Sequence, residues 1–303
     1  MRTPFDDPFG ERNPTRLTPW CALAVIAGGL LVLVAVLIGF TMAGGKIEAL
    51  FHLSEVITIG GATLGALITM SSTKVIKDLI RGILQALKGS LYNKKACAEL
   101  FQLFYGLARQ VRQEGLLALD AHITNPNESP LFRQYPKINK NHHARAFICD
   151  ALALIVDGTV ESRQLAEWLD EEVRVVEREH HAAVSALSKT ADALPGFGIV
   201  AAVLGIVVTM QSIGGPVDEI GHKVGAALVG TFLGILMAYG FFAPLAGRME
   251  GLGEQEVLFL KAVSSAVIAM NEGASPKDVV VRARRIVGTD CRPSQGELKT
   301  LLG

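Results

Sequence analysis

The chain has 303 residues, of which 50% are hydrophobic and 19% are charged. Lysine plus arginine and aspartate plus glutamate balance at 29 each, so the composition does not favour a nucleic-acid-binding protein. The four cysteines show no CxxC or Cys/His spacing, which argues against a disulfide framework or a zinc site and indicates free thiols in a reducing compartment.

Four apolar runs without any charged residue are the main feature of the sequence. A bilayer core needs about 20 apolar residues per helix, with about 17 tolerable. The fold class is therefore predicted as all-α: a polytopic membrane protein with four transmembrane helices in a 2+2 layout and a large helical cytoplasmic domain. The runs cover Trp20–Thr41, Val56–Met70, Leu194–Met210 and Val224–Ala246.

Five segments follow in chain order. We expect a disordered Pro-rich extension over 1–19, a hairpin over 20–70 (helices 20–41 and 56–70), a helical domain over 71–192, a second hairpin over 193–246 (helices 194–210 and 224–246) and a helical tail over 247–303. Inside the domain, helical spacing predicts helices within 74–119, 144–156 and 160–189, and proline and polar residues predict a loop over 124–135. In the tail, Ser275-Pro276 predicts a capped helix start.

The basic residues predict the orientation in the membrane. Sixteen lie between the second and third runs and eight in the tail, whereas each short connection within a hairpin carries only one. The positive-inside rule then places both termini and the large domain in the cytoplasm.

None of the four runs contains a titratable acid or base, although ion pathways normally need one within the membrane. Either the protein moves no ions, or another chain supplies the titratable group. The strongest polar groups at depth are the hydroxyls of Thr209, Thr231 and Tyr239. For Thr231 the alternative is a plain helical threonine bonded to its own i−4 carbonyl.

Small residues and prolines mark the surfaces of these runs. Gly61/Gly65 and Gly230/Gly234 are GxxxG pairs, which allow close helix packing within the chain or between copies. Pro195 and Pro244 flank the second hairpin on its inner side, where a proline can kink a helix or simply mark its boundary.

Long motifs at both ends of the chain resemble the MotA family of flagellar stator proteins. The match runs in order from about Trp20 to Leu302. The segments that carry it are Ala43–Lys46, Ile59–Ala66, Gly115–Asp120, Asp192–Val207 and Val229–Ala246.

The resemblance implies a proton-conducting stator subunit of the bacterial flagellar motor and no enzyme, organic cofactor or metal site. It implies five copies of the chain in the inner membrane around two copies of MotB, whose aspartate carries the proton. The unit would turn ion flow into torque on the rotor protein FliG, and so support motility and chemotaxis.

Site residues carry over position by position. Pro195 and Pro244 match two prolines proposed to couple proton flow to loop movement, and Arg112 and Asp120 match a charged pair that works against the rotor, with Asp120 where relatives often have Glu. Glu172 matches a further functional acid of the cytoplasmic domain.

The choice of ion also follows from the resemblance. Sodium-driven relatives have a threonine where this chain has Ala202, while Thr231 is retained. The missing hydroxyl would leave a poorer cage for Na⁺, so a proton is expected as the transported ion.

Two other classes stay open. An ExbB/TolQ-like energiser of envelope transport would use the same ion, but those proteins differ in span count and loop order. A passive scaffold or membrane enzyme is the third reading. The pairs His142-His143 and His180-His181 lie in polar stretches, so we interpret them as solvated histidines.

Overall fold

The structure is a computed structural model that describes residues 17–211 and 213–302. The expected extension over 1–19 lies outside the described residues, except for its last three residues, which begin the first helix. The described part of the chain is helical and contains no strand, so the all-α prediction is confirmed.

Four stretches are long and apolar enough to cross a membrane, as predicted. Their surfaces are rich in exposed aliphatic side chains, such as Leu31 (69% exposed) and Val203 (53% exposed), which suits contact with lipid or with partner helices. The stretches contain α1 (Leu17–Met42), η2 (Ile47–Leu50) with α2 (Leu53–Met70), α9 (Ser162–Met210), and the continuous run of α10 (Val217–Met237), the π-helical turn η4 (Ala238–Phe242) and α11 (Ala243–Asn271).

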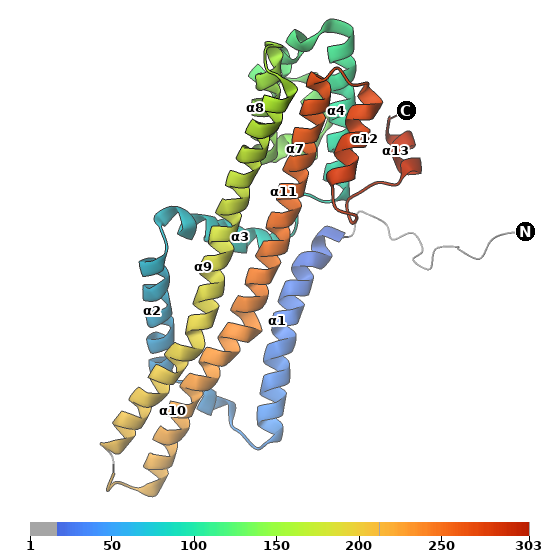
Figure 1. Ribbon diagram of the computed structural model, residues 1–303. Coiled ribbons are helices and arrows are strands. Elements are labelled where there is room, and N and C mark those ends of the chain that lie inside the picture. The colour runs from blue at the N-terminus through green and yellow to red at the C-terminus, as the bar shows by residue number, and fades with distance from the viewer. Residues whose placement is uncertain (1–16, 212, 303) are drawn as a thin grey trace, which may run out of the picture.

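Figure 1 shows α9 running antiparallel to α10 and α11 along the length of the molecule. α1 and α2 flank this pair on opposite sides, and α3 lies across it. α4, α8 and α12 gather at the end away from the α9–α10 turn (Figure 1). The predicted cytoplasmic domain therefore continues directly from the two long helices.

The domain is built on helices from both sides of the second hairpin. Its core contains the fully buried Phe101, Phe104, Phe132 and Phe259. Its elements are α3 (Thr73–Lys88), α4 (Lys94–Glu114), η3 (Leu116–Leu119), α5 (Asp120–Thr124), α6 (Pro130–Gln134), α7 (Pro136–Lys140), α8 (His142–Val156), α12 (Pro276–Ile286) and α13 (Gln295–Leu302).

Two details differ from the sequence prediction. The helical stretch 74–119 is divided at Gly89 and Gly115, which have φ angles of 97° and 87°, a backbone region that favours glycine. The predicted loop 124–135 contains the short helix α6, whose start is capped by the Ser129 hydroxyl accepting from the amide of Phe132.

Another difference is the continuity of α9. We expected a charged helix to about residue 189 and a separate span from 194, but α9 is one helix of 49 residues. The apolar span and the charged helix are therefore parts of one rod.

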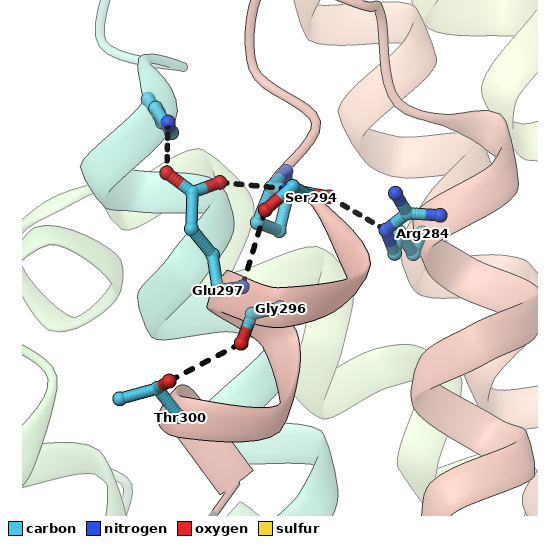
Figure 2. A network of polar contacts seen from close by, with 7 residues as sticks. Arg284, Ser294, Gly296, Glu297 and Thr300 are labelled. Carbon is cyan, nitrogen blue, oxygen red and sulfur yellow. Dashed lines mark hydrogen bonds and ion pairs between the residues drawn. The ribbon is translucent and has the colours of Figure 1, made fainter. Parts of the chain in front are cut away.

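The C-terminal helices are held by side-chain caps. The predicted cap at Ser275 is confirmed, since its Oγ accepts from the amide of Asp278 at 3.3 Å. Figure 2 shows a capping box at α13, in which the Ser294 amide donates to Glu297 and the Glu297 amide donates to Ser294 Oγ. Glu297 also binds Lys94 at 2.7 Å, which fastens α13 to the start of α4.

Candidate functional site

The crossing of α9 and α10 is the tightest helix contact in the membrane region. A Cβ atom built on Gly234 would lie 2.6 Å from the carbonyl oxygen of Leu194, and one on Gly198 would lie 2.9 Å from that of Gly230. No side chain fits there, so the predicted close packing of small residues is confirmed within the chain for these glycines. By contrast, Gly61 and Gly65 have nothing within 4 Å of an added Cβ.

The structure brings together only some of the expected ion-path residues. Ala202 is buried (8% exposed) at the crossing, and the Cα of Thr231 lies 3.3 Å from a Cβ built on Gly198. Thr209 is fully buried one residue before the end of α9 at Met210, and its Oγ1 donates to the Gly205 carbonyl at 2.8 Å. Tyr239 is 64% exposed.

Thr231 does not behave as a plain helical threonine. Its side chain is half-buried and makes no hydrogen bond with any residue in the described ranges, whereas Thr209 makes the usual i−4 bond. The alternative of back-bonding for Thr231 is therefore wrong, and its hydroxyl is available for another partner.

The two prolines lie within continuous helices. Pro195 is inside α9, so the alternative that it marks a helix boundary is wrong. Pro244 is at the start of α11, immediately after the π-helical turn η4, and it has no N–H to donate to a preceding carbonyl. The wider turn accommodates this loss, and π-helical turns of this kind are frequent at functional sites.

Glu55 is a buried acid at the membrane crossing that the sequence analysis missed. The predicted span begins one residue later, but the apolar stretch in the structure starts at Ile47. Glu55 is 6% exposed, and its Oε2 lies 3.3 Å from a Cβ built on Gly230. Glu55 was not considered in the sequence analysis, because it lies just outside the predicted run that starts at Val56.

Arg112 and Asp120 both lie on the surface of the predicted cytoplasmic domain, free of ion pairs within the described part of the chain. The two residues do not share a helix, because α4 ends at Glu114 and Gly115 redirects the chain into η3. Asp120 accepts a 3.4 Å hydrogen bond from Thr124. Both charges are thus available to an external partner.

Glu172 is half-buried on α9. Burial raises the pKa of its carboxyl, and the nearby Asp150 adds to this effect while His143 opposes it. Glu172 is therefore less accessible to solvent than Arg112 and Asp120, which are exposed.

The buried carboxylate of Glu256 joins helices α8, α9 and α11. Glu256 on α11 accepts hydrogen bonds from Tyr92 at 2.7 Å, His143 at 2.6 Å and His180 at 2.8 Å. Burial alone would raise its pKa, but these hydrogen bonds hold the pKa at about 2. The His143 side chain is 58% exposed and that of His180 35%, so both meet solvent as expected, but each also hydrogen-bonds this carboxylate, which the sequence did not predict.

The cluster borders a cleft of ≈ 320 Å³ between α3, α9 and α11. Asp78, Arg81 and Glu179 line it together with His180 and Glu256. The described residues contain no group of three or more ligand side chains with metal-binding geometry. The hydrogen bonds from Tyr92, His143 and His180 to Glu256 join α8, α9 and α11.

Comparisons with known proteins agree over most of the chain. The model for "Motility protein A N-terminal" matches residues 26–115, and the "MotA/TolQ/ExbB proton channel family" model matches residues 139–261. Motility protein A of Salmonella typhimurium is 35% identical over 277 residues, which are 91% of this chain and 94% of the relative. Chemotaxis protein LafT of Vibrio parahaemolyticus is 33% identical over 275 residues, or 91% and 96% of the two chains.

Solved structures share the fold. A chain of the Campylobacter jejuni MotAB structure ("Structure of C. jejuni MotAB") has a TM-score of 0.74 at 22% identity, covering 90% of this chain and 99% of that one. A chain of the flagellar MotAB stator complex from Bacillus subtilis has a TM-score of 0.70 at 26% identity, covering 91% and 98%.

The fold and the glycine-packed hairpin thus define a helical membrane protein of the proton-channel class, which is not an enzyme. The chain belongs to the motility protein A family and is a stator subunit of the bacterial flagellar motor. An ExbB/TolQ-like energiser is not favoured, because the N-terminal model and the Salmonella relative are named motility protein A and the Vibrio relative is named a chemotaxis protein.

Proposed function

We propose that this chain forms a proton-conducting unit with a MotB dimer in the inner membrane, with both termini in the cytoplasm. The observation that carries the proposal is the apolar outer face of α9, where Ile199, Val203 and Ile206 are all about half exposed. This face offers no acid of its own to an ion. A partner helix that brings a carboxylate to it would complete a path, and the related solved structures are titled as MotAB complexes.

Several copies of the chain would surround that partner helix, and we propose five, as the family resemblance implies. The apolar face of α9 and the exposed Tyr239 on η4 would then face the partner or a neighbouring copy. Pro195 and Pro244 would pass small shifts of the partner contact into the two long helices.

The rotor contact would be made by Arg112, Asp120 and Glu172. Among the described residues, the two exposed charges form no ion pair that would have to break before they meet opposite charges on FliG. Electrostatic pairing of this kind gives fast and reversible contact, which a stepping motor needs.

Protons would be the driving ion, with no organic cofactor. Ala202 offers no hydroxyl at the crossing, so a bare Na⁺ would lack one oxygen ligand there. Thr231, with its unpaired hydroxyl, would line the route without being a metal ligand.

The test compares the chain alone with the chain co-expressed with its MotB-type partner. Cytoplasmic acidification is measured in cells after the external medium is made acidic. We expect proton entry only when both chains are present. Substantial specific entry with this chain alone would overturn the two-chain path.

A further inference from the structure

Glu55 occupies an unusual position for an acid at a helix start. It is in the first turn of α2, where a carboxylate ordinarily lies in water near the positive end of the helix dipole. Here the residue is only 6% exposed, and its side chain is directed into the bundle. The helix start therefore explains the residue type but not its burial.

The surroundings of this carboxylate are the α9–α10 crossing. A Cβ built on Gly230 would lie 3.3 Å from Glu55 Oε2, 3.1 Å from the Ala201 Cβ and 3.3 Å from the Ala202 amide nitrogen. The carboxylate thus reaches the crossing because Gly230 has no side chain. The carboxylate and the α9 segment that carries Ala202 both lie next to Gly230. Gly230 immediately precedes Thr231 in the sequence.

The crossing lies deep in the hairpin. Ala202 is eight residues before the end of α9 at Met210, which corresponds to about 12 Å at 1.5 Å per residue. The intervening surface is aliphatic, with Val203, Ile206 and Val207 each about half exposed. A charged carboxylate at such a level is costly in hydrocarbon unless it is paired or takes up a proton.

The described residues provide little compensation for a charge. The Ser54 hydroxyl donates to Glu55 Oε1 at 3.3 Å, and no arginine, lysine or histidine of the described ranges forms an ion pair with Glu55. On the same face of α2, two turns further on, Thr63 Oγ1 is buried without a hydrogen bond. Two under-satisfied polar groups along one buried face indicate a route for water or a proton.

We propose that Glu55 is a second proton-binding residue of the ion path, in addition to the partner's carboxylate; this inference rests on the proposed function. A proton from the outer side would convert the Glu55 carboxylate to the acid. The acid would release that proton to the partner's carboxylate, which becomes an acid while Glu55 returns to the anion. Each transfer moves one proton and conserves the net charge.

The experiment uses the chain in complex with its MotB-type partner in lipid vesicles, with proton uptake measured under an imposed pH gradient. Three variants are compared with the wild type: Glu55→Gln, Glu55→Asp and, as a matched control, Glu48→Gln, which changes an exposed acid in the same connection. Co-purification with the partner checks assembly. We expect Glu55→Gln to lower the uptake rate about tenfold or more, Glu55→Asp to shift its pH dependence and Glu48→Gln to match the wild type.

Uptake by Glu55→Gln within about twofold of the wild type overturns the inference but leaves the proposed function in place. No uptake by the wild-type complex overturns the proposed function instead. A second measurement tests proton binding by Glu55 whichever uptake result is obtained. It is the infrared difference spectrum between acid and neutral pH. A protonated-carboxyl band that is missing in Glu55→Gln and displaced in Glu55→Asp supports proton binding, and an unchanged spectrum refutes it.

Discussion

The Nε2 atom of His180 on α9 lies 2.8 Å from Oε2 of Glu256 on α11, so a single hydrogen bond joins the two long helices beyond the predicted membrane spans. His143 of α8 binds the other carboxylate oxygen, and Tyr92 adds a third contact from the segment before α4. Both halves of the chain therefore meet at one carboxylate.

Removal of this carboxylate should weaken the domain. Glu256→Ala leaves the buried Tyr92 hydroxyl and two histidines without their acceptor, which should cost about 3 kcal/mol. The melting temperature of the purified protein in nanodiscs, followed by circular dichroism, should fall clearly. Glu254→Ala, a change at an exposed acid on the same helix, is the control and should melt like the wild type.

Stability should depend on pH at both ends of the range. The pKa of Glu256 is depressed to about 2, so its contribution is full above the ordinary value of 4.5 and is lost as the pH falls towards about 2. The pKa of His143 is raised above 6.5, mainly by its hydrogen bond to Glu256, so its contribution is full below pH 6.5 and is lost as the pH rises through the raised value.

Maximum stability is therefore expected between about pH 4.5 and 6.5. His143→Asn should flatten the alkaline side of the curve and leave the acid side in place. Melting temperatures measured from pH 3 to 9 would test this. An alkaline side that persists unchanged in His143→Asn would show that other groups cause it.

Charge reversal at the proposed rotor surface should reduce motility without affecting assembly. Exposed ion pairs contribute about 0–1 kcal/mol each, so Arg112→Glu or Asp120→Lys alone should give a partial loss of swimming speed. The double variant should be worse unless the charges on FliG are reversed to match. Normal swimming by the double variant, at normal membrane levels, would mean that these residues do not form the contact.

The glycine crossing should tolerate no added methyl group. Gly234→Ala places a Cβ 2.6 Å from the Leu194 carbonyl oxygen, so α9 and α10 must separate, at a cost of about 1–3 kcal/mol. We expect loss of torque and a lower melting temperature. Gly196→Ala adds the same methyl group to α9 where nothing lies within 4 Å, and it should be neutral. Equal effects of the two changes would contradict the packing argument.

Rotation should follow the proton gradient. Tethered cells should keep rotating when sodium is removed and stop when the pH gradient and membrane potential are collapsed. Rotation that tracks sodium would contradict the assignment, and Ala202→Thr would then be the next variant to examine.

Local patterns predicted much of the fold. Apolar runs located the four spans, and the pair Ser275-Pro276 located the start of α12, because both signals depend on neighbouring residues. The continuity of α9 through Pro195 was missed, because a proline in a sequence usually indicates the boundary of a helix.

The buried acids escaped prediction for two different reasons. Glu55 was missed because the limits of a predicted span are placed at charged residues. The span was therefore taken to start at the next residue, Val56. Glu256 was missed because its partners lie 76, 113 and 164 residues away, where no periodicity connects them. Only tertiary packing brings such groups together.

The continuity of α9 also makes it a lever. About 45 Å of unbroken helix separate Ala202 from Glu172, at 1.5 Å per residue. A tilt of about 10° at the crossing would displace Glu172 by about 8 Å, larger than the spacing of one helical turn. A tilt of this size, driven by the proposed proton step, would reach the proposed rotor surface as a displacement of molecular dimensions.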